Sequence, residues 1–350
     1  MLAATVQNNG SLALSQVQNP VLPRGGALLR VIGCGLCGSD LDKWRHRKAP
    51  PGAVLGHEVV GRIEALCPEA TSDFRVGDRV ACAHHTPCGA CHDCRNGAES
   101  MCAQFKRSNL IPGGFSQRLA LSADHLRLTT FAVPDAIGDA EASCVEPMAC
   151  VLRAVRRGGE AYQGRVAIIG LGFIGLMAAQ VYKMRGYWVE GYDRQADRVA
   201  LGLSRGWLDA GVTVDADAPL IPPAEAPVDR VFLSVVTPQT LSLSLQRARD
   251  GGALILFASP HHAGPTLDPG LLYFRELSVI PSYSPAVEDL REAAALIFNG
   301  QIDVSPLCTH SFPMSAIDEA LARYQRGEAI KIFLTPPPPE TPEPPAEARI

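Results

Sequence analysis

Short hydrophobic runs recur along the chain, and their spacing changes near its middle. Residues 1–32 alternate hydrophobic and polar positions between turn signals, a pattern that predicts short strands, and strands are also predicted within 54–80 and 115–128. From residue 165 onward, short hydrophobic strands alternate with helical segments, which is typical of a parallel sheet with crossover helices. Strands are predicted at 165–170, 188–192, 229–236, 252–258 and 277–280. The sequence therefore predicts an α/β fold with a separate β-rich part.

The final part of the chain is too short to form a domain of its own. Helices are predicted at 287–298 and 314–326, and a strand at 329–334. Because 284–335 holds so few strands, we expect it to pack on the β-rich part. The predicted domains are 1–152 together with 284–335, and an inserted 153–283, with the active site in the cleft between them at the carboxyl ends of the sheet. Residues 336–350, rich in proline, glutamate and alanine, are predicted to be disordered.

One turn has the pattern of a dinucleotide-binding site. The strand at 165–170 runs into Gly170-x-Gly172-x-x-Gly175, a helical segment follows, and the next strand ends at Asp193. The first glycine permits the tight turn, the second lets backbone approach a pyrophosphate, and the third lets helix pack on strand. Glycine-rich turns are common as purely structural features, but the strand–helix–strand context favours a dinucleotide, whose phosphates the helix N-terminus would bind.

The same region predicts NAD as the cofactor. Asp193 would accept hydrogen bonds from both ribose hydroxyls and repel a 2′-phosphate, whereas Arg194 and Arg198 could pair with that phosphate. Residues that follow strands should lie near the nicotinamide. The expected cofactor-binding residues are Gly170, Gly172, Phe173, Ile174, Gly175, Asp193, Arg194, Arg198, Val235, Val236, Thr237, Ala258 and Ser259.

Four cysteines, Cys88, Cys91, Cys94 and Cys102, crowd into a short loop region. Four thiolates complete a tetrahedral zinc site and leave no open position, so such a site is structural. It would hold together the segment 84–114, which lacks a core of its own. An iron–sulfur cluster, unligated thiols and a zinc-ribbon module for nucleic acid are the alternatives.

A second, sparser set of residues has the composition of an open metal site. It consists of Cys37, His57, Glu58 and Glu146. Each alone is an ordinary core or surface residue. Together, a thiolate, an imidazole and a carboxylate would leave the fourth zinc position for water or substrate. Ser39, two residues after Cys37, would accept the proton of a bound hydroxyl, although a helix N-cap is its alternative role.

Composition narrows the class of partner. The net charge of −4 gives no electrostatic basis for binding nucleic acid. No hydrophobic run reaches the roughly 18 residues that a membrane helix needs, and the N-terminus lacks a signal-peptide pattern. The eleven cysteines are an odd number, and their clustering favours metal ligation in a reducing compartment. We therefore expect a cytoplasmic protein.

Taken together, these motifs resemble those of the zinc-dependent medium-chain dehydrogenase/reductase family, the alcohol dehydrogenase superfamily. The motifs are Gly35 to Asp40, Gly56-His57-Glu58-x-x-Gly61, Gly77-Asp78-Arg79-Val80, the four spaced cysteines, Glu146-Pro147 and the Gly170 turn. The resemblance covers about residues 1–335. It implies a GroES-like catalytic domain with an inserted Rossmann domain, and a homodimer or homotetramer. It also implies two zinc ions, the catalytic one bound by Cys37, His57 and either Glu58 or Glu146.

Within the family, Glu146-Pro147 resembles the branch of sorbitol, threonine and glucose dehydrogenases. Residues 273–284 resemble polyol and cyclitol dehydrogenases, which implies that Tyr283 contacts substrate, although Ser282 stands where sorbitol dehydrogenases have arginine. Trp44 is expected to form a wall of the cleft. The implied function is hydride transfer between NAD and a secondary alcohol of a polyol, sugar or cyclitol. A threonine-type amino-alcohol dehydrogenase and a non-catalytic zinc- and dinucleotide-binding protein are the alternatives.

Two further expectations concern the proton path and assembly. Many relatives have a histidine where this chain has Asp42, and a carboxylate is a weak base near neutral pH. The basic stretch 43–48 is interpreted as a solvated loop rather than a site for an anionic substrate. The hydrophobic strand at 277–280 is predicted to be an edge strand, which favours pairing between copies of the chain.

Overall fold

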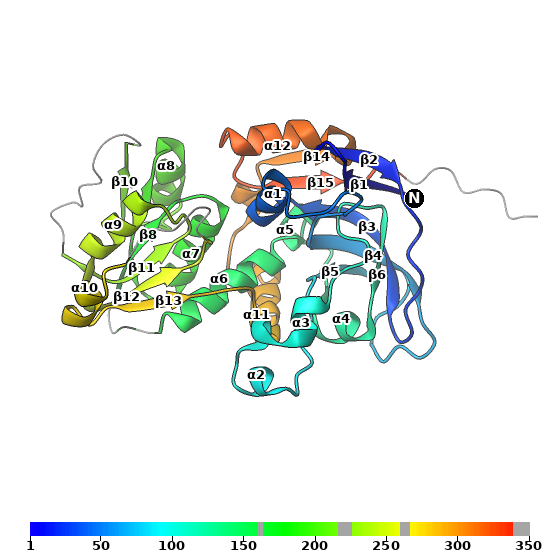
Figure 1. Cartoon of the computed structure of the whole chain (residues 1–350), viewed down its shortest axis with the longest axis horizontal. Coiled ribbons are helices and arrows are strands. Elements are labelled where there is room, and N and C mark those ends of the chain that lie inside the picture. The colour runs from blue at the N-terminus through cyan, green and yellow to red at the C-terminus, as the bar shows by residue number, and fades with distance from the viewer. Residues whose placement is uncertain (160, 162–163, 216–225, 260–266, 339–350) are drawn as a thin grey trace, which may run out of the picture. The chain divides into compact units, whose positions relative to one another are not determined.

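The computed structural model describes residues 1–159, 161, 164–215, 226–259 and 267–338, and the chain forms two compact units (Figure 1). The first unit contains Met1–Arg95, Met101–Glu146 and the chain from Ser305 onward. The second contains Asn96–Ser100 and Pro147–Val304. A middle segment is therefore inserted into a unit built from both ends of the chain.

The second unit extends beyond the predicted inserted domain, because it includes 147–152 and 284–304. The reason lies in a cluster of ion pairs between helices α6 (Val145–Arg157) and α11 (Val287–Phe298). Arg156 contacts carboxylate oxygens of Glu288 and Asp289 at 3.2 Å each and of Glu292 at 2.5 Å. These contacts fasten α11 to α6 rather than to the β-rich unit.

The first unit is built on a mainly antiparallel sheet. Its strands are β3 (Ala27–Gly35), β4 (Glu58–Leu66), β5 (Arg79–Cys82), β6 (Arg118–Leu121), β7 (Thr130–Ala132), β14 (His310–Pro313) and β15 (Ile332–Thr335). They are ordered β14-β15-β3-β4-β5-β7, with β14 and β15 pairing in parallel and β6 also pairing with β3, while β1 (Leu2–Val6) and β2 (Leu12–Gln16) form a hairpin. Alternate side chains such as Leu29 and Val31 enter the core, as the period of two predicts.

Short helices and turns complete the first unit. They are α1 (Gly38–Arg45), α2 (His92–Arg95), α3 (Ala103–Arg107), α4 (Ala123–Leu128), α5 (Asp139–Ala142) and α12 (Ile317–Gln325), with 3₁₀ turns at Ser305–Leu307 and Met314–Ala316. A further 3₁₀ turn, Glu99–Met101, belongs mostly to the second unit. The predicted strands over 115–128 are wrong in their second half. Ser122 accepts a hydrogen bond from the N–H of His125, and this N-cap starts α4.

The second unit contains the predicted parallel sheet. Its strands are β8 (Arg165–Ile169), β9 (Trp188–Asp193), β10 (Ala210–Thr213), β11 (Val228–Leu233), β12 (Ala248–Leu256) and β13 (Ser278–Pro281). All pair in parallel in the order β10-β9-β8-β11-β12-β13, the order of a Rossmann sheet. Helices α7 (Phe173–Met184), α8 (Ala196–Ser204) and α9 (Pro238–Arg247) pack on these strands, and α10 (Pro269–Phe274) precedes β13.

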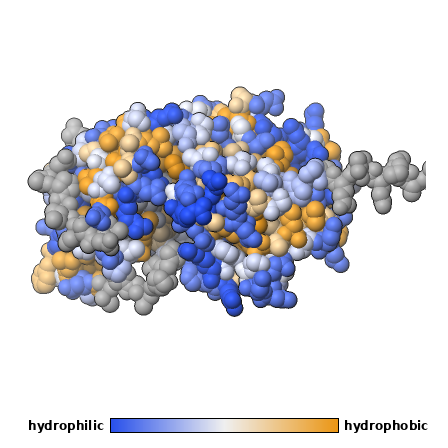
Figure 2. Space-filling view, turned by 90° about the horizontal axis from the view of Figure 1, so that it is seen from above, coloured by the Kyte–Doolittle hydropathy of each residue, from blue (hydrophilic) through white to orange (hydrophobic). Residues whose placement is uncertain are grey.

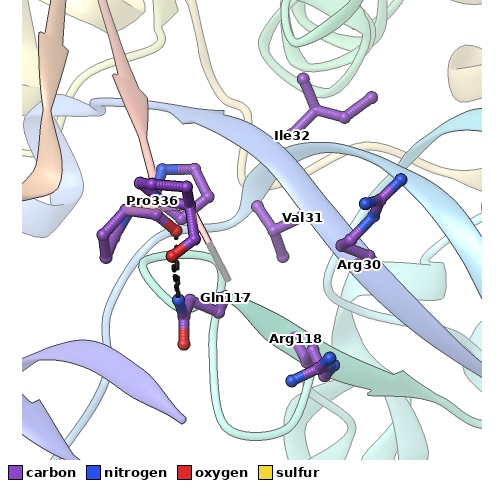
Figure 3. Close-up of a pocket in the computed structure, with 8 residues that line it drawn as sticks. Arg30, Val31, Ile32, Gln117, Arg118 and Pro336 are labelled. Carbon is purple, nitrogen blue, oxygen red and sulfur yellow. Dashed lines mark hydrogen bonds between the residues drawn. The ribbon is translucent and has the colours of Figure 1, made fainter. Parts of the chain in front are cut away.

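The beginning of the predicted tail lies against the first unit. The side-chain amide of Gln117 donates hydrogen bonds to the carbonyl oxygens of Pro337 and Pro338, at 3.1 and 3.2 Å. Figure 3 shows Gln117 and Pro336 in a pocket with Arg30 and Val31, and Pro337 and Pro338 also line this pocket. Residues 339–350 of the predicted tail lie outside the described residues.

Hydrophobic and polar residues are interspersed on the face of the molecule that Figure 2 shows. None of the helices that the structure describes has the length and hydrophobicity to cross a membrane.

Candidate active site and metal centres

The four clustered cysteines of the first unit converge on one point. Their sulfur atoms all lie within 4.8 Å of one another. The Sγ–Sγ distances are 3.5 Å for Cys91 and Cys94, 3.6 Å for Cys88 and Cys102, and 4.0 Å for Cys88 and Cys94. Tetrahedral zinc with Zn–S bonds of about 2.3 Å requires sulfurs about 3.8 Å apart. The set therefore fits one zinc ion with no open position.

Backbone amides favour the thiolates of Cys88 and Cys102, whereas burial raises the pKa of the Cys94 thiol. The N–H of Cys91 donates to Sγ of Cys88 at 3.4 Å, and the N–H of Cys88 donates to Sγ of Cys102 at 3.5 Å. Burial disfavours the Cys102 thiolate, but the N–H groups of Cys88, Phe105 and Gln104 outweigh it and lower the pKa of the Cys102 thiol. Lowered thiol pKa values suit metal ligation, because the ligand is the thiolate.

A second group joins Cys37, His57 and Glu58, whose ligand atoms lie within 4.8 Å of one another. The register of the sheet brings them together, because Gly35 at the end of β3 pairs with Glu58 at the start of β4. Cys37 follows Gly35 by two residues and caps helix α1, while His57 immediately precedes β4. Residues twenty positions apart in sequence thus become neighbours.

A buried carboxylate orients His57. Asp40, in the first turn of α1, places Oδ1 at 3.3 Å from Nδ1 of His57. The same carboxylate accepts from the N–H groups of Gly56 and Cys37, at 3.2 and 3.3 Å. Burial opposes protonation of His57, yet Asp40 and Cys37 raise its pKa well above the ordinary value. With Nδ1 facing Asp40, Nε2 remains for a cation, an arrangement common around metal-binding histidines. We did not predict this role of Asp40 from sequence.

Glu58 has one oxygen paired and one unsatisfied. Lys331, just before β15, is buried, contacts Oε2 of Glu58 and donates to the carbonyl of Leu36 at 3.2 Å. Burial disfavours the charged amine, but the Glu58 carboxylate raises the pKa of Lys331. Among the described residues, nothing donates a hydrogen bond to the buried Oε1 of Glu58. A buried carboxylate oxygen without a donor is costly, and it fits a metal ion next to Cys37 and His57.

The other candidate ligand, Glu146, lies beside this group rather than within it. Its Oε1 is 4.0 Å from Nδ1 of His84, and the His84 ring lies 4.7 Å from the ring of His57, between centroids. Burial lowers the pKa of His84 well below the ordinary value. His84 therefore links Glu146 to the predicted ligands. His84 was not predicted from the sequence, because a histidine between a strand and a cysteine loop has no motif of its own.

Helix α1 also places the predicted proton acceptor. Oγ of Ser39 donates to Sγ of Cys37 at 3.4 Å, and Ser39 is exposed. The N-cap of α1 is Cys37, so the alternative role of Ser39 as N-cap is wrong. The Asp42 carboxylate contacts Nζ of Lys48 at 2.6 Å and Nδ1 of His46 at 2.9 Å. The basic stretch 43–48 thus supplies the partners of Asp42.

The two predicted substrate residues differ in surroundings. Trp44 in α1 packs against the core of the first unit and donates from Nε1 to the carbonyl of Gly10 at 2.5 Å. These contacts give it a structural role, and its role as a cleft wall stays a prediction. Tyr283 follows β13 in the second unit and is 60% exposed. Its contact with substrate also stays a prediction.

The glycine turn of the second unit has a distinct geometry at each glycine. Gly170 has φ of +89°, which other residues rarely adopt. A Cβ on Gly175 would lie 1.8 Å from the carbonyl oxygen of Gly170, so helix α7 needs glycine to pack there. A Cβ on Gly172 would meet only Nη1 of Arg198, at 3.7 Å. This leaves room beside Gly172, while binding of a pyrophosphate there and at Phe173 and Ile174, the first residues of α7, stays a prediction.

Asp193, at the end of β9, is tied to the turn. Its Oδ2 accepts from the N–H of Leu171 at 2.6 Å, and its Oδ1 accepts from the N–H of Gln195 at 2.8 Å. Each oxygen keeps a lone pair for a ribose hydroxyl. Nη1 of Arg198 lies 3.9 Å from Oδ2. Next to Asp193, a shallow pocket is lined by Arg194, Gln195, Thr213, Val214 and Asp215.

The remaining predicted cofactor residues follow β11 and β12, whose carboxyl ends lie at the same edge of the parallel sheet as Gly170. Val235 and Val236 come directly before Thr237, which caps α9 by accepting from the N–H of Thr240. Ala258 and Ser259 follow β12. The predicted residues therefore lie at the same edge of the sheet. Their contacts with a cofactor stay predictions.

Comparison with known proteins gives the same division of the chain. A family model of the alcohol dehydrogenase GroES-like domain matches residues 23–134, and one of zinc-binding dehydrogenase matches residues 174–299. A sorbitol dehydrogenase of Halalkalibacterium halodurans is 28% identical over 349 residues, with 96% of this chain and 98% of the relative covered. An L-threonine 3-dehydrogenase of Bacillus licheniformis is 26% identical over 330 residues, with 91% and 93% covered.

The fold recurs among solved structures. One from Sinorhizobium meliloti 1021, described as a zinc-binding dehydrogenase and bound to NADP, matches with a TM-score of 0.83 and 25% identity, over 96% of this chain and 99% of the other. The GroES-like model falls on the antiparallel unit, and the zinc-binding dehydrogenase model falls on the parallel one. The chain belongs to the zinc-dependent medium-chain dehydrogenase/reductase family, the alcohol dehydrogenase superfamily, and is an oxidoreductase.

Proposed function

We propose that the protein transfers hydride between NAD and a secondary alcohol of a polyol, sugar or cyclitol. The observation that supports this most is the buried group of Cys37, His57 and Glu58, with one Glu58 oxygen unsatisfied and the Ser39 hydroxyl beside the thiol. The closed cysteine set cannot perform this chemistry, because it has no open position. The active site is the open group, and the closed set has a structural role.

Each residue near the open group has a distinct task. Cys37, His57 and Glu58 hold the zinc, and Glu146 lies beyond them, next to His84. When bound, zinc supplies a Lewis acid that acidifies the substrate hydroxyl, and the nicotinamide supplies the hydride acceptor. Ser39 takes the hydroxyl proton, because its Oγ lies next to the ligand sulfur. Asp40 fixes the tautomer of His57, and Lys331 balances the charge of Glu58.

The substrate class separates this function from its alternatives. The similar identities to sorbitol and threonine dehydrogenases, 28% and 26%, do not favour one substrate strongly. We expect NADH formation with polyols or cyclitols in a panel that also contains amino alcohols. Turnover of L-threonine alone would establish the amino-alcohol alternative. A folded, zinc-loaded protein without turnover of any alcohol would support the non-catalytic alternative.

The protein is expected to prefer NAD over NADP. A 2′-phosphate would lie next to the Asp193 carboxylate, whose repulsion should lower kcat/KM for NADP about tenfold or more. Arg198, 3.9 Å from that carboxylate, works in the opposite direction. Arg198→Ala removes the guanidinium and should therefore increase the ratio of kcat/KM for NAD to kcat/KM for NADP. Comparable kcat/KM values for the two cofactors in the wild-type protein would show that the arginines prevail.

We also propose a homodimer or homotetramer assembled through β13. This strand is at the edge of the parallel sheet, with Val279 and Ile280 partly exposed. On the preceding helix, Tyr273 and Phe274 are 77% and 84% exposed. An edge strand flanked by exposed aromatic residues favours pairing. Light scattering at micromolar concentration should give an oligomeric mass that Ile280→Glu lowers, whereas a monomeric wild-type mass would contradict assembly.

A cytoplasmic location is proposed from the cysteines. All eleven are described residues and all are free thiols. Both proposed zinc sites use thiolates, which a reducing compartment preserves.

A further inference from the structure

Two cysteines outside both metal groups lie close together. Sγ of Cys144 and Sγ of Cys308 are 3.7 Å apart, although the residues are far apart in sequence. Cys144 is fully buried at the junction of α5 and α6, and Cys308 is partly exposed just after the 3₁₀ turn at Ser305–Leu307. Neither thiol belongs to a candidate metal group.

The pair stands where the chain passes between its two units. Cys144 precedes Pro147, the first residue of the long segment of the second unit, and Cys308 follows Val304, the last residue of that segment. A bond between the two sulfurs would close a ring around the whole of Pro147–Val304. Both cysteines themselves belong to the first unit, so their distance is internal to it.

Residues proposed for the active site flank the pair on both sides. Glu146 lies two residues after Cys144, at the start of α6. On the other side, the N–H groups of Thr309 and His310, next to Cys308, donate to the carbonyl of Lys331 at 3.1 and 3.2 Å. Lys331 in turn contacts Glu58. A change at either sulfur is therefore one or two residues away from the groups around the metal site.

We propose that Cys144 and Cys308 form a reversible disulfide in exchange with small-molecule disulfides such as oxidised glutathione. The Cys308 thiolate attacks the small disulfide, bonds to one of its sulfurs and releases the other as a thiol. The Cys144 thiolate then attacks the mixed disulfide, forms the Cys144–Cys308 bond and releases the second thiol. Two protein thiols are oxidised, one small disulfide is reduced, and the two protons leave with the released thiols.

The surroundings suit this order of attack. Cys308 is the more accessible sulfur, and its hydrogen bond with Cys144 lowers the pKa of the Cys308 thiol. Burial raises the pKa of the Cys144 thiol, so Cys144 is the later, resolving partner and loses its proton only as it attacks the mixed disulfide. A reducing compartment permits disulfides of this transient, exchangeable kind.

Formation of the bond should change turnover, a consequence that rests on the proposed function. The sulfurs must move from 3.7 Å to about 2.05 Å apart. This movement pulls the chain that begins α6, and Glu146 with it. Because misplacement by about 1 Å can cost about 10²-fold in rate, we expect kcat to fall about tenfold or more on oxidation and to recover with reductant.

The test uses the full-length, zinc-loaded protein incubated with oxidised glutathione, followed by peptide mapping without reduction. We expect a linked pair of peptides that contain Cys144 and Cys308, lighter than their sum by two hydrogens, and its loss on adding dithiothreitol. The absence of this linkage at full oxidation would overturn the proposal. The peptide mapping does not depend on activity, so it shows whether the disulfide forms even where no alcohol is turned over.

Two single variants test whether the loss of kcat on oxidation comes from the pair of Cys144 and Cys308. Cys308→Ala removes the partly exposed partner and should abolish both the linkage and the loss of kcat. Cys150→Ala removes a cysteine of the same helix as Glu146 and should behave as the wild-type protein does. Zinc content is measured throughout, because oxidation of the metal thiolates would also lower activity. An equal loss of kcat in Cys308→Ala, or a loss that follows zinc release, would contradict regulation by this pair.

Discussion

His57→Ala is expected to lower kcat by more than about 10²-fold while the protein stays folded. Even residues that only support a metal ligand cost about 10- to 100-fold when they are replaced, and His57 is itself one of three proposed ligands. The fold should survive, because the antiparallel sheet around His57 is held by its own core. The zinc content should fall from two ions per chain to about one, and the circular dichroism spectrum should not change.

Cys91→Ser is the matched change in the closed set. It should affect stability more than turnover, the opposite of His57→Ala. Removal of one of four thiolates opens a site whose role is to hold the segment around α2 and α3, which contributes few buried hydrophobic residues. We expect a lower thermal midpoint or loss of soluble protein, with kcat per folded molecule reduced less than in His57→Ala. One zinc ion per wild-type chain, or the same pattern of loss in both variants, would contradict two sites with different roles.

Ser39→Ala is expected to lose about 10² or more in kcat, and Asp42→Ala less than about tenfold. General acid–base groups contribute roughly 10² to 10⁴ in rate, and the Ser39 hydroxyl lies 3.4 Å from the ligand sulfur of Cys37. Asp42 is a weak base near neutral pH, and its carboxylate faces Lys48 and His46.

The two contributions are separated by measuring kcat against pH for Ser39→Ala, Asp42→Ala and Asp42→His with one good substrate. Asp42→His should raise kcat near neutral pH if proton release limits the rate. Equal losses in the two alanine variants would show that the carboxylate is the true relay and that Ser39 has no special role.

The regular elements could be predicted because their signals are local. The helix at 287–298 is found with the predicted bounds, and the parallel strands lie within a few residues of their predicted positions. Strand β10 was not predicted, because its four residues Ala210–Thr213 include a glycine and make no hydrophobic run. Helix α4 was missed for a different reason, since its hydrophobic residues also suit a strand and only the Ser122 cap decides.

The residues around the active site come together only in the tertiary fold, so fewer of them could be predicted from the sequence. The cysteines and His57 have recognisable spacing, so their groups could be predicted before the geometry was known. Asp40 and Lys331 have no such signal. Asp40 faces His57 only because β3, which leads into α1, pairs with β4, and Lys331 reaches Glu58 only because β15 pairs with β3. The grouping of Glu58, rather than Glu146, with Cys37 and His57 likewise follows from the register of β3 and β4.

The central claim is that alcohol oxidation with NAD depends on zinc at the open group. The most direct measurement follows NADH formation with the best alcohol of the panel while zinc is titrated into chelator-treated protein whose closed site is still filled. The proposed function predicts a rate that rises from near zero with the second zinc ion per chain and stays near zero in His57→Ala. Full activity with only the closed site filled, or no activity at two zinc ions per chain with any alcohol of the panel, would contradict it.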